Sequence, residues 1–156
     1  MTHNIYTLLS DVEGQVYVRL LDHSLDYCDS FILVIRHSVE ASASAMAVLD
    51  RLEPYLVCAE ESSEWPGTQL LGSTAGVYKY KLTSDTIFIL GEVAERLFDW
   101  QQPELPEDLC LFRPDGNPWL VTIAHEEDAY LVLSNDELAA LIESIPILSL
   151  ELDRGT

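Results

Sequence analysis

The sequence predicts an α+β fold in a single domain, built mainly from an antiparallel sheet with about three helices. Three observations lead to this prediction. Strand-like segments follow one another through short turns between residues 107 and 133, which is typical of antiparallel pairing. Apolar residues at helical spacing fill other stretches, such as residues 38–52. The chain has 156 residues, of which 48% are hydrophobic, enough for residues 1–156 to bury one core.

The first third of the chain predicts two strands and a helix. Residues 15–21 alternate between two faces and predict a strand, and residues 22–30 form a polar loop. Residues 31–35 are a continuous apolar run, the pattern of a buried strand. Ser38 can cap a helix that Pro54 would end. The apolar face of this helix would contain Val39, Ala43, Met46, Leu49 and Leu52.

Weaker strand signals follow, on either side of a turn. Residues 55–59 fit a short strand or a helical turn, and the pattern leaves both open. The dipeptide Pro66-Gly67 indicates a turn inside a polar loop. Residues 68–71 fit a second short strand.

A clearer strand signal and a linker come next. Residues 77–82 alternate cleanly and place Lys79 and Lys81 on one face. Charged side chains of this kind protect exposed sheet edges, so we expect an edge strand here. Residues 101–107 contain prolines and link this part to the last third. This link is the only candidate for a break between two sub-layers of the domain.

A helix is predicted between these two segments. Ser84 or Asp85 can act as its cap. Its apolar residues at helical spacing are Ile87, Leu90, Ala94, Leu97 and Phe98. In the alternative, residues 87–90 finish a hairpin and the helix begins at Gly91.

The last third predicts a three-stranded meander followed by a capped helix. Its strands would be residues 109–112, 119–124 and 129–133. Asp115-Gly116 suits a tight hairpin turn, and residues 126–128 form a polar turn. Ser134 and Glu137 have the spacing of a capping box, in which each side chain hydrogen-bonds the backbone of the other. The helix would continue through Leu138, Leu141, Ile142 and Ile145 and end at Pro146.

The charge of the chain is far from balanced. Asp and Glu total 27 against 8 Lys and Arg, for a formal net charge of −19. Such a surface repels phosphate backbones, so we expect no binding of nucleic acid. It favours encounter with a basic protein partner. The alternative is that the acidity only keeps the protein in solution.

Cysteine usage and hydropathy predict a cytoplasmic protein. Cys28, Cys58 and Cys110 are single and unevenly spaced, unlike a disulfide framework or a zinc site. The first residues lack the basic and apolar regions of a signal peptide. No apolar run approaches 18 residues, so no membrane span is expected.

No motif predicts catalysis or a cofactor. The chain has no G-x-S-x-G elbow, and its Gly72–Gly76 stretch lacks the lysine of a phosphate loop. Cys28 lies between acidic residues that would raise its pKa and make it a poor nucleophile. We therefore expect a protein that is not an enzyme and has no catalytic residues. An alternative is a small metal-dependent enzyme using His125, Glu126 and carboxylates of residues 22–29, although no paired-histidine spacing exists.

Tryptophans and acidic residues are the best candidates for partner binding. Trp65 and Trp100 lie in or beside linkers, where an indole either locks a loop to the core or anchors a partner. Loop locking is the preferred interpretation for both. The residues predicted to contact a partner are Trp119, Glu126, Glu127, Asp128 and Trp65.

Two stretches of the second half resemble known proteins. They are Trp65-Pro66-Gly67-Thr68, and Arg113-Pro114-Asp115-Gly116-Asn117-Pro118-Trp119 with its continuation to Ala124-His125-Glu126. Both look like segments of small uncharacterised bacterial proteins, some of which resemble immunity proteins found beside polymorphic toxins. The resemblance includes no motif with a chemical role, so it assigns no functional residue. It implies a protein that binds and neutralises a toxin domain.

The sequence thus predicts a non-enzymatic cytoplasmic binding protein, an inhibitor of a basic, nuclease-type toxin in its most specific form. Besides the metal enzyme, the other alternative is a regulatory or structural subunit that forms a homodimer through an exposed strand edge.

Overall fold

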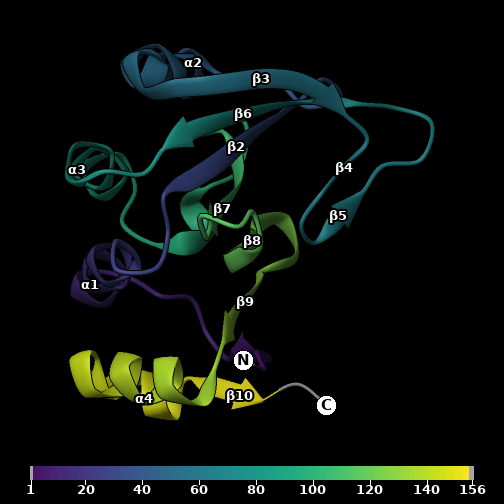
Figure 1. Cartoon of the computed structure of the whole chain (residues 1–156). Helices are drawn as coiled ribbons and strands as arrows, with labels where there is room; N and C mark the ends of the chain where they lie inside the picture. The colour runs from purple at the N-terminus through teal and green to yellow at the C-terminus, as the bar shows by residue number, and fades with distance from the viewer. Residues whose placement is uncertain (1, 155–156) are drawn as a thin grey trace.

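The computed structural model describes residues 2–154 and confirms the α+β class. Its main sheet has eight antiparallel strands in the order β10-β1-β9-β8-β7-β2-β6-β3 (Figure 1). These strands are β1 (Asn4–Leu8), β2 (Ser30–Arg36), β3 (Leu56–Ser62), β6 (Ala75–Lys81), β7 (Glu107–Phe112), β8 (Pro118–Ile123), β9 (Asp128–Leu133) and β10 (Leu152–Arg154). A separate hairpin pairs β4 (Glu64–Trp65) with β5 (Thr68–Gln69).

Within the described residues, four α-helices lie on one face of the sheet, one more than the approximate number predicted (Figure 1). They are α1 (Gln15–Ser24), α2 (Ala43–Leu52), α3 (Ser84–Val93) and α4 (Asn135–Ser144). Short 3₁₀ turns are η1 (Glu53–Tyr55), η2 (Leu97–Asp99), η3 (Ala124–Glu126) and η4 (Pro146–Leu150). In the described residues, no helix combines the length and apolar character needed to cross a membrane.

The sheet buries side chains on both faces. The larger core lies under the helices and contains two fully buried tryptophans, Trp100 and Trp119. The smaller core lies on the opposite face, where Trp65 of the β4–β5 hairpin packs on the sheet. The sheet residues in this smaller core are Ile32, Val34, Ala75, Val77, Cys110, Val121 and Ile123. The hairpin therefore covers part of the sheet face opposite the helices.

The predicted meander and capped helix are confirmed. Strands β7, β8 and β9 are neighbours in the sheet, and Gly116 adopts a φ of 86° in the turn between β7 and β8. The Ser134 hydroxyl accepts from the Glu137 amide at 3.2 Å, and Glu137 accepts from the Ser134 amide at 2.8 Å. Arg113 also forms an ion pair with Glu137, with 2.7 Å between its Nη1 and Glu137 Oε2. This part of the sequence encodes its structure locally.

The prediction of a strand at residues 15–21 is wrong, because these residues form α1. The buried positions of this helix are Tyr17, Leu20, Leu21 and Ser24, a spacing of three, four and seven residues. Val16 and Val18 suggested alternation, yet both are only half-buried at the edge of the helical stripe. Over only seven residues, a helical spacing and a strand alternation of apolar residues are hard to tell apart. Packing against the rest of the protein therefore decides for the helix.

Two helix boundaries differ from the prediction. The predicted cap Ser38 is replaced by Ser42, so α2 starts later and its buried face becomes Ala45, Val48, Leu49 and Leu52. Thr83, not Ser84 or Asp85, caps α3, and its hydroxyl accepts from Thr86 N at 3.2 Å. Residues 84–93 are helical, so the alternative hairpin is wrong. Leu97 and Phe98 lie in η2 beyond the end of the helix.

The prediction of an edge strand at residues 77–82 is also wrong. Strand β6 pairs with β2 on one side and with β3 on the other, so Lys79 and Lys81 lie inside the sheet order. The edge strands are β3 and β10. Tyr55 ends η1 and residues 56–59 belong to β3, which resolves that ambiguity in favour of a strand.

Candidate functional site

A β-bulge at the start of β7 brings two acidic side chains together. Ile32 of β2 pairs with Cys110, but Val34 pairs with Glu107, so the register between the two strands shifts. The bulge places Asp108 in the left-handed region with a φ of 58°. Aspartate tolerates this conformation better than most residues. Because a bulge breaks the strict alternation of side chains, adjacent residues can approach the same group.

That shared group is Arg36 at the end of β2. Its Nε lies 2.7 Å from Glu107 Oε2, and its Nη2 lies 3.8 Å from Asp108 Oδ2. The guanidinium stacks over the Trp65 ring at 5.5 Å and approaches His125 Nδ1 at 3.5 Å. We call these five residues the Arg36 cluster. The Glu107 and Asp108 side chains are only 5% and 1% exposed, so one cation compensates two buried acids.

Asp108 is held by neutral donors as well as by charge. Trp65 Nε1–H donates to Asp108 Oδ2 at 3.0 Å, and the Ala124 amide donates to Oδ1 at 3.2 Å. Burial raises the pKa of Asp108, while the hydrogen bonds and Arg36 act in the opposite direction. Burial likewise raises the pKa of Glu107, against the attraction of Arg36. The arrangement ties the hairpin to the sheet.

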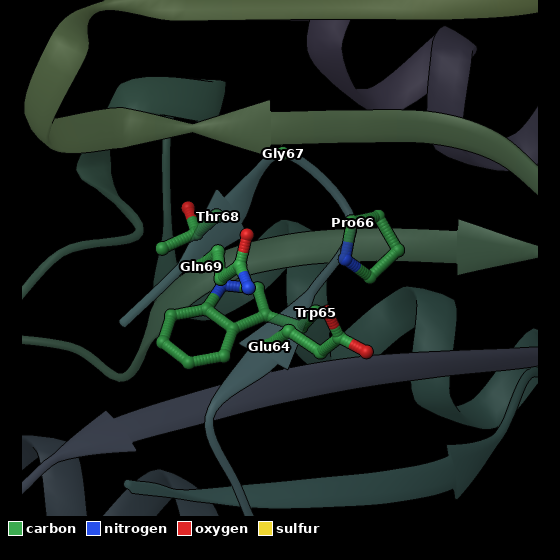
Figure 2. A pocket seen from close by; sticks show the side chains of 6 residues that line it. All are labelled: Glu64, Trp65, Pro66, Gly67, Thr68 and Gln69. Atoms are coloured by element: carbon green, nitrogen blue, oxygen red, sulfur yellow. The ribbon is translucent and has the colours of Figure 1, made fainter. Parts of the chain in front are cut away.

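The tip of the β4–β5 hairpin forms a shallow hollow on the surface. Figure 2 shows its six lining residues, Glu64 to Gln69, with Gly67 at the turn between the two short strands. Gly67 has a φ of 86°, and a Cβ built on it would lie 2.7 Å from Ile123 side-chain atoms. The turn thus needs glycine both for its backbone conformation and for its close approach to the sheet.

Replacing Gly67 with alanine is expected to lower the free energy of unfolding by about 1–3 kcal/mol, because the backbone becomes strained and Ile123 must move. Chemical denaturation measures the change. Gly116→Ala is the matched control, since its φ is also 86° but nothing lies within 4 Å of the added Cβ. A Gly67 variant no less stable than the Gly116 variant would contradict the proposed close contact.

The two tryptophans predicted to contact a partner are buried. Trp119 is 0% exposed and stacks on Tyr27 with ring centroids 6.0 Å apart, so its assignment to a binding surface is wrong. Trp65 is 7% exposed and uses its indole N–H inside the Arg36 cluster. Trp119 follows a turn in the sequence, but its position in a central strand directs the ring into the helical core. The loop-locking prediction for Trp65 and Trp100 is confirmed, because both are buried.

The three acidic residues of the predicted site lie at the surface. Glu126 and Glu127 are exposed and Asp128 is half-buried. Glu127 ends η3 in the left-handed conformation, with a φ of 52°, and its amide donates to the Ala124 carbonyl at 3.0 Å. This geometry leaves the turn of Glu126, Glu127 and Asp128 at the surface, between strands β8 and β9. A role of these acids in partner binding stays a prediction.

The proposed combination of His125 with residues 22–29 is wrong. His125 lies beside Arg36 at one end of β2, whereas Asp29 directly precedes the other end and donates to the Phe112 carbonyl at 3.0 Å. The seven residues of β2 separate the two by roughly 20 Å. In residues 2–154, no three His, Cys, Asp or Glu side chains are placed to share a metal ion. Cys28 is buried, and burial raises the pKa of its thiol to about 12.

Sequence reasoning missed four further acids at the same end of the sheet as the Glu126–Asp128 turn. They are Asp11 and Glu13 before α1, Glu95 after α3 and Asp99 in η2. Backbone bonds join these segments, such as Gly14 N to Glu95 O at 2.9 Å. A hollow brings Asp11 and Glu127 together. No local signal could have grouped them, because they come from distant parts of the chain.

The chain was compared with known protein families, proteins and structures. No protein-family model, no curated protein and no solved structure matches the chain.

Proposed function

We propose that this protein is a non-enzymatic binding protein for a cationic protein partner. The observation that carries the proposal is where the acidic residues lie. In residues 2–154 only two acids, Glu107 and Asp108, are buried. The surface therefore carries most of the excess behind the net charge of −19, and four of the eight basic residues, Arg36, Arg51, Arg96 and Arg113, are in ion pairs with acids of the same chain. A surface of this kind accelerates encounter with positively charged proteins.

The specific form of the proposal is an immunity protein or inhibitor that neutralises a basic, nuclease-type toxin domain. A nuclease binds phosphates through cationic side chains, and an acidic protein can occupy the same groove. The resemblance of the Trp65–Thr68 and Arg113–Trp119 stretches to small uncharacterised bacterial proteins, some of which resemble immunity proteins, supports this form. Expression of the neighbouring gene with and without this protein tests it. A neighbour that is not toxic, or whose toxicity this protein does not relieve, would contradict the toxin-specific form.

Neutralising the acidic turn is expected to slow partner binding. The triple variant Glu126→Gln, Glu127→Gln and Asp128→Asn should reduce the association rate constant at low salt about threefold to tenfold. The control variant, Asp50→Asn, Glu60→Gln and Glu143→Gln, removes the same charge from exposed sites on α2, β3 and α4. Surface plasmon resonance at two salt concentrations measures both. Equal rates for the two variants would mean that the turn has no special role.

A homodimer is the second candidate, because β3 is a sheet edge that exposes the apolar residues Leu56 and Val57. It hydrogen-bonds to β6 alone, and its first six residues, Leu56 to Glu61, are exposed. Exposed edges of this length pair readily with another strand. Light scattering at low and high salt tests this candidate against the 17.5 kDa monomer mass. A monomer under both conditions would remove it.

A further inference from the structure

Helices α1 and α3 lie side by side on the helical face (Figure 1). Residues of both helices line a groove along their junction. Two hollows meet in it, because Val18 and Gly91 line both. A Cβ added to Gly91 would lie 3.9 Å from Val18 Cγ2, which is ordinary contact. The missing side chain at residue 91 therefore leaves space beside Val18, where the two hollows meet. We call this groove the α1–α3 groove.

The apolar side of the groove ends in an exposed aromatic residue. Phe88 lines one of the two hollows and is 65% exposed. Its neighbour Ile87 is buried in the core, so α3 turns one apolar side chain inward and the next outward. Phe88 does not belong to the cores of the described residues, so their packing does not require it. An aromatic ring beside a hollow gives a partner both a ring to pack on and a cavity to fill.

The rim of the groove is acidic. Asp22 and Glu92 border the hollow beside Phe88, and Glu13 and Glu95 border the other. Two of these acids are already paired within the chain, Glu13 with Arg96 at 2.9 Å and Glu92 with Arg51 at 2.9 Å, which leaves Asp22 and Glu95 as the rim acids outside these ion pairs. The groove thus combines an apolar floor with negative edges. Its complement is an element with one apolar stripe and basic side chains on either side of it.

We infer that the α1–α3 groove is the docking site for a basic amphipathic helix of the cationic partner. This inference rests on the proposed function and specifies its surface. A helix fits because its apolar residues at spacings of three and four form a ridge that packs between two others. Its apolar stripe packs on Phe88 and Val18 above Gly91, and its lysines or arginines face Asp22 and Glu95.

Two synthetic peptides and two variants test the inference. One probe is an 18-residue leucine–lysine peptide with its leucines in one helical stripe, and the other is a scrambled peptide of the same composition. Gly91→Gln fills the groove, and Phe88→Ser removes the exposed ring. Because glutamine is a better helix former than glycine, Gly91→Gln should raise Tm by about 1–4 °C. A variant that is more stable and yet binds less well separates docking from folding.

Isothermal titration calorimetry and amide chemical shifts give the readouts. We expect the striped peptide to bind at least tenfold more tightly than the scrambled one, to shift amides of α1 and α3, and to lose at least tenfold in affinity in each variant. If both peptides bind equally to all three proteins, charge alone holds the partner: the inference fails and the proposed function stands. If neither peptide binds, both fail. A dimer that Phe88→Ser dissociates would show that a second copy fills the groove, which also overturns the inference.

Discussion

Replacing Arg36 with methionine is expected to lower the free energy of unfolding at pH 7 by about 3–5 kcal/mol. Methionine keeps much of the length of the side chain but leaves Glu107 and Asp108 buried without their cation. Trp65 and the Ala124 amide still donate to Asp108, but two like charges then share one dry site. The cost is therefore that of uncompensated buried charge, well above that of a lost surface contact.

The exposed pair of Arg51 with Glu92 provides the control. Its atoms are 2.9 Å apart, near the 2.7 Å between Arg36 and Glu107, but the side chains are 40% and 50% exposed. Solvent screens such a pair, so Arg51→Met should cost less than about 1 kcal/mol. Urea denaturation of both variants measures the difference. Equal losses would mean that burial is not what gives the Arg36 cluster its importance.

The Arg36 variant should also depend on pH in a defined direction. Burial raises the pKa values of Glu107 and Asp108 in the folded protein, and removing Arg36 raises them further. A carboxyl with a raised folded pKa favours the folded state when protonated, and this advantage is lost as pH rises through the interval between the unfolded and folded values. The deficit of the variant should therefore shrink between pH 7 and pH 5. A deficit that is unchanged or larger at pH 5 would contradict uncompensated charge as its cause.

Glu137 behaves in the opposite way and sets the lower limit of that experiment. Burial alone would raise its pKa, but the hydrogen bonds from Arg113 and from the Ser134 amide together lower it below its ordinary value of 4.5. Its stabilising effect is complete above that value and disappears only as pH falls through the lower folded pKa. Measurements at pH 5 and above therefore report on the Arg36 cluster without loss of the capping box.

The parts of the fold that the sequence predicts are those whose signals are local. The Asp115-Gly116 turn and the Ser134–Glu137 box are complete within a few residues, and both are present as expected. Helix α1 was missed because its stripe of Tyr17, Leu20 and Leu21 becomes visible only once the core is known. Strand β10 has three residues and pairs with β1, across almost the entire chain. Pairing over such a separation leaves no pattern in either segment.

The Arg36 cluster could not be predicted for a related reason. Its members come from β2, the β4–β5 hairpin, β7 and η3, and a register shift brings Glu107 and Asp108 to the same arginine. Alternation would have placed adjacent acids on opposite faces of the strand. Trp65 was correctly predicted to lock a loop, because an aromatic residue among polar ones carries that signal alone. The sequence could not predict that the Trp65 indole N–H donates to the Asp108 carboxylate.

Replacing Trp100 with alanine is expected to cost about 3–5 kcal/mol, the range for removing a buried aromatic side chain. Trp100 is 0% exposed and follows η2. Its Nε1–H donates to the Tyr17 hydroxyl at 3.1 Å, and that hydroxyl donates to the Leu90 carbonyl at 2.7 Å. The chain of two bonds connects η2 to α1 and to α3. Removing the indole therefore opens a cavity and also loosens the contact between the helices that form the α1–α3 groove.

Tyr17→Phe separates the two parts of this effect. It keeps the ring but leaves the Trp100 N–H without its acceptor and the Leu90 carbonyl without a donor, which should cost about 1–3 kcal/mol. Because both single variants break the same bond, the Trp100→Ala and Tyr17→Phe losses should not add in the double variant. Denaturation of all three proteins completes the cycle. Strict additivity would show that the two side chains act independently, and the groove would then owe its shape to apolar packing alone.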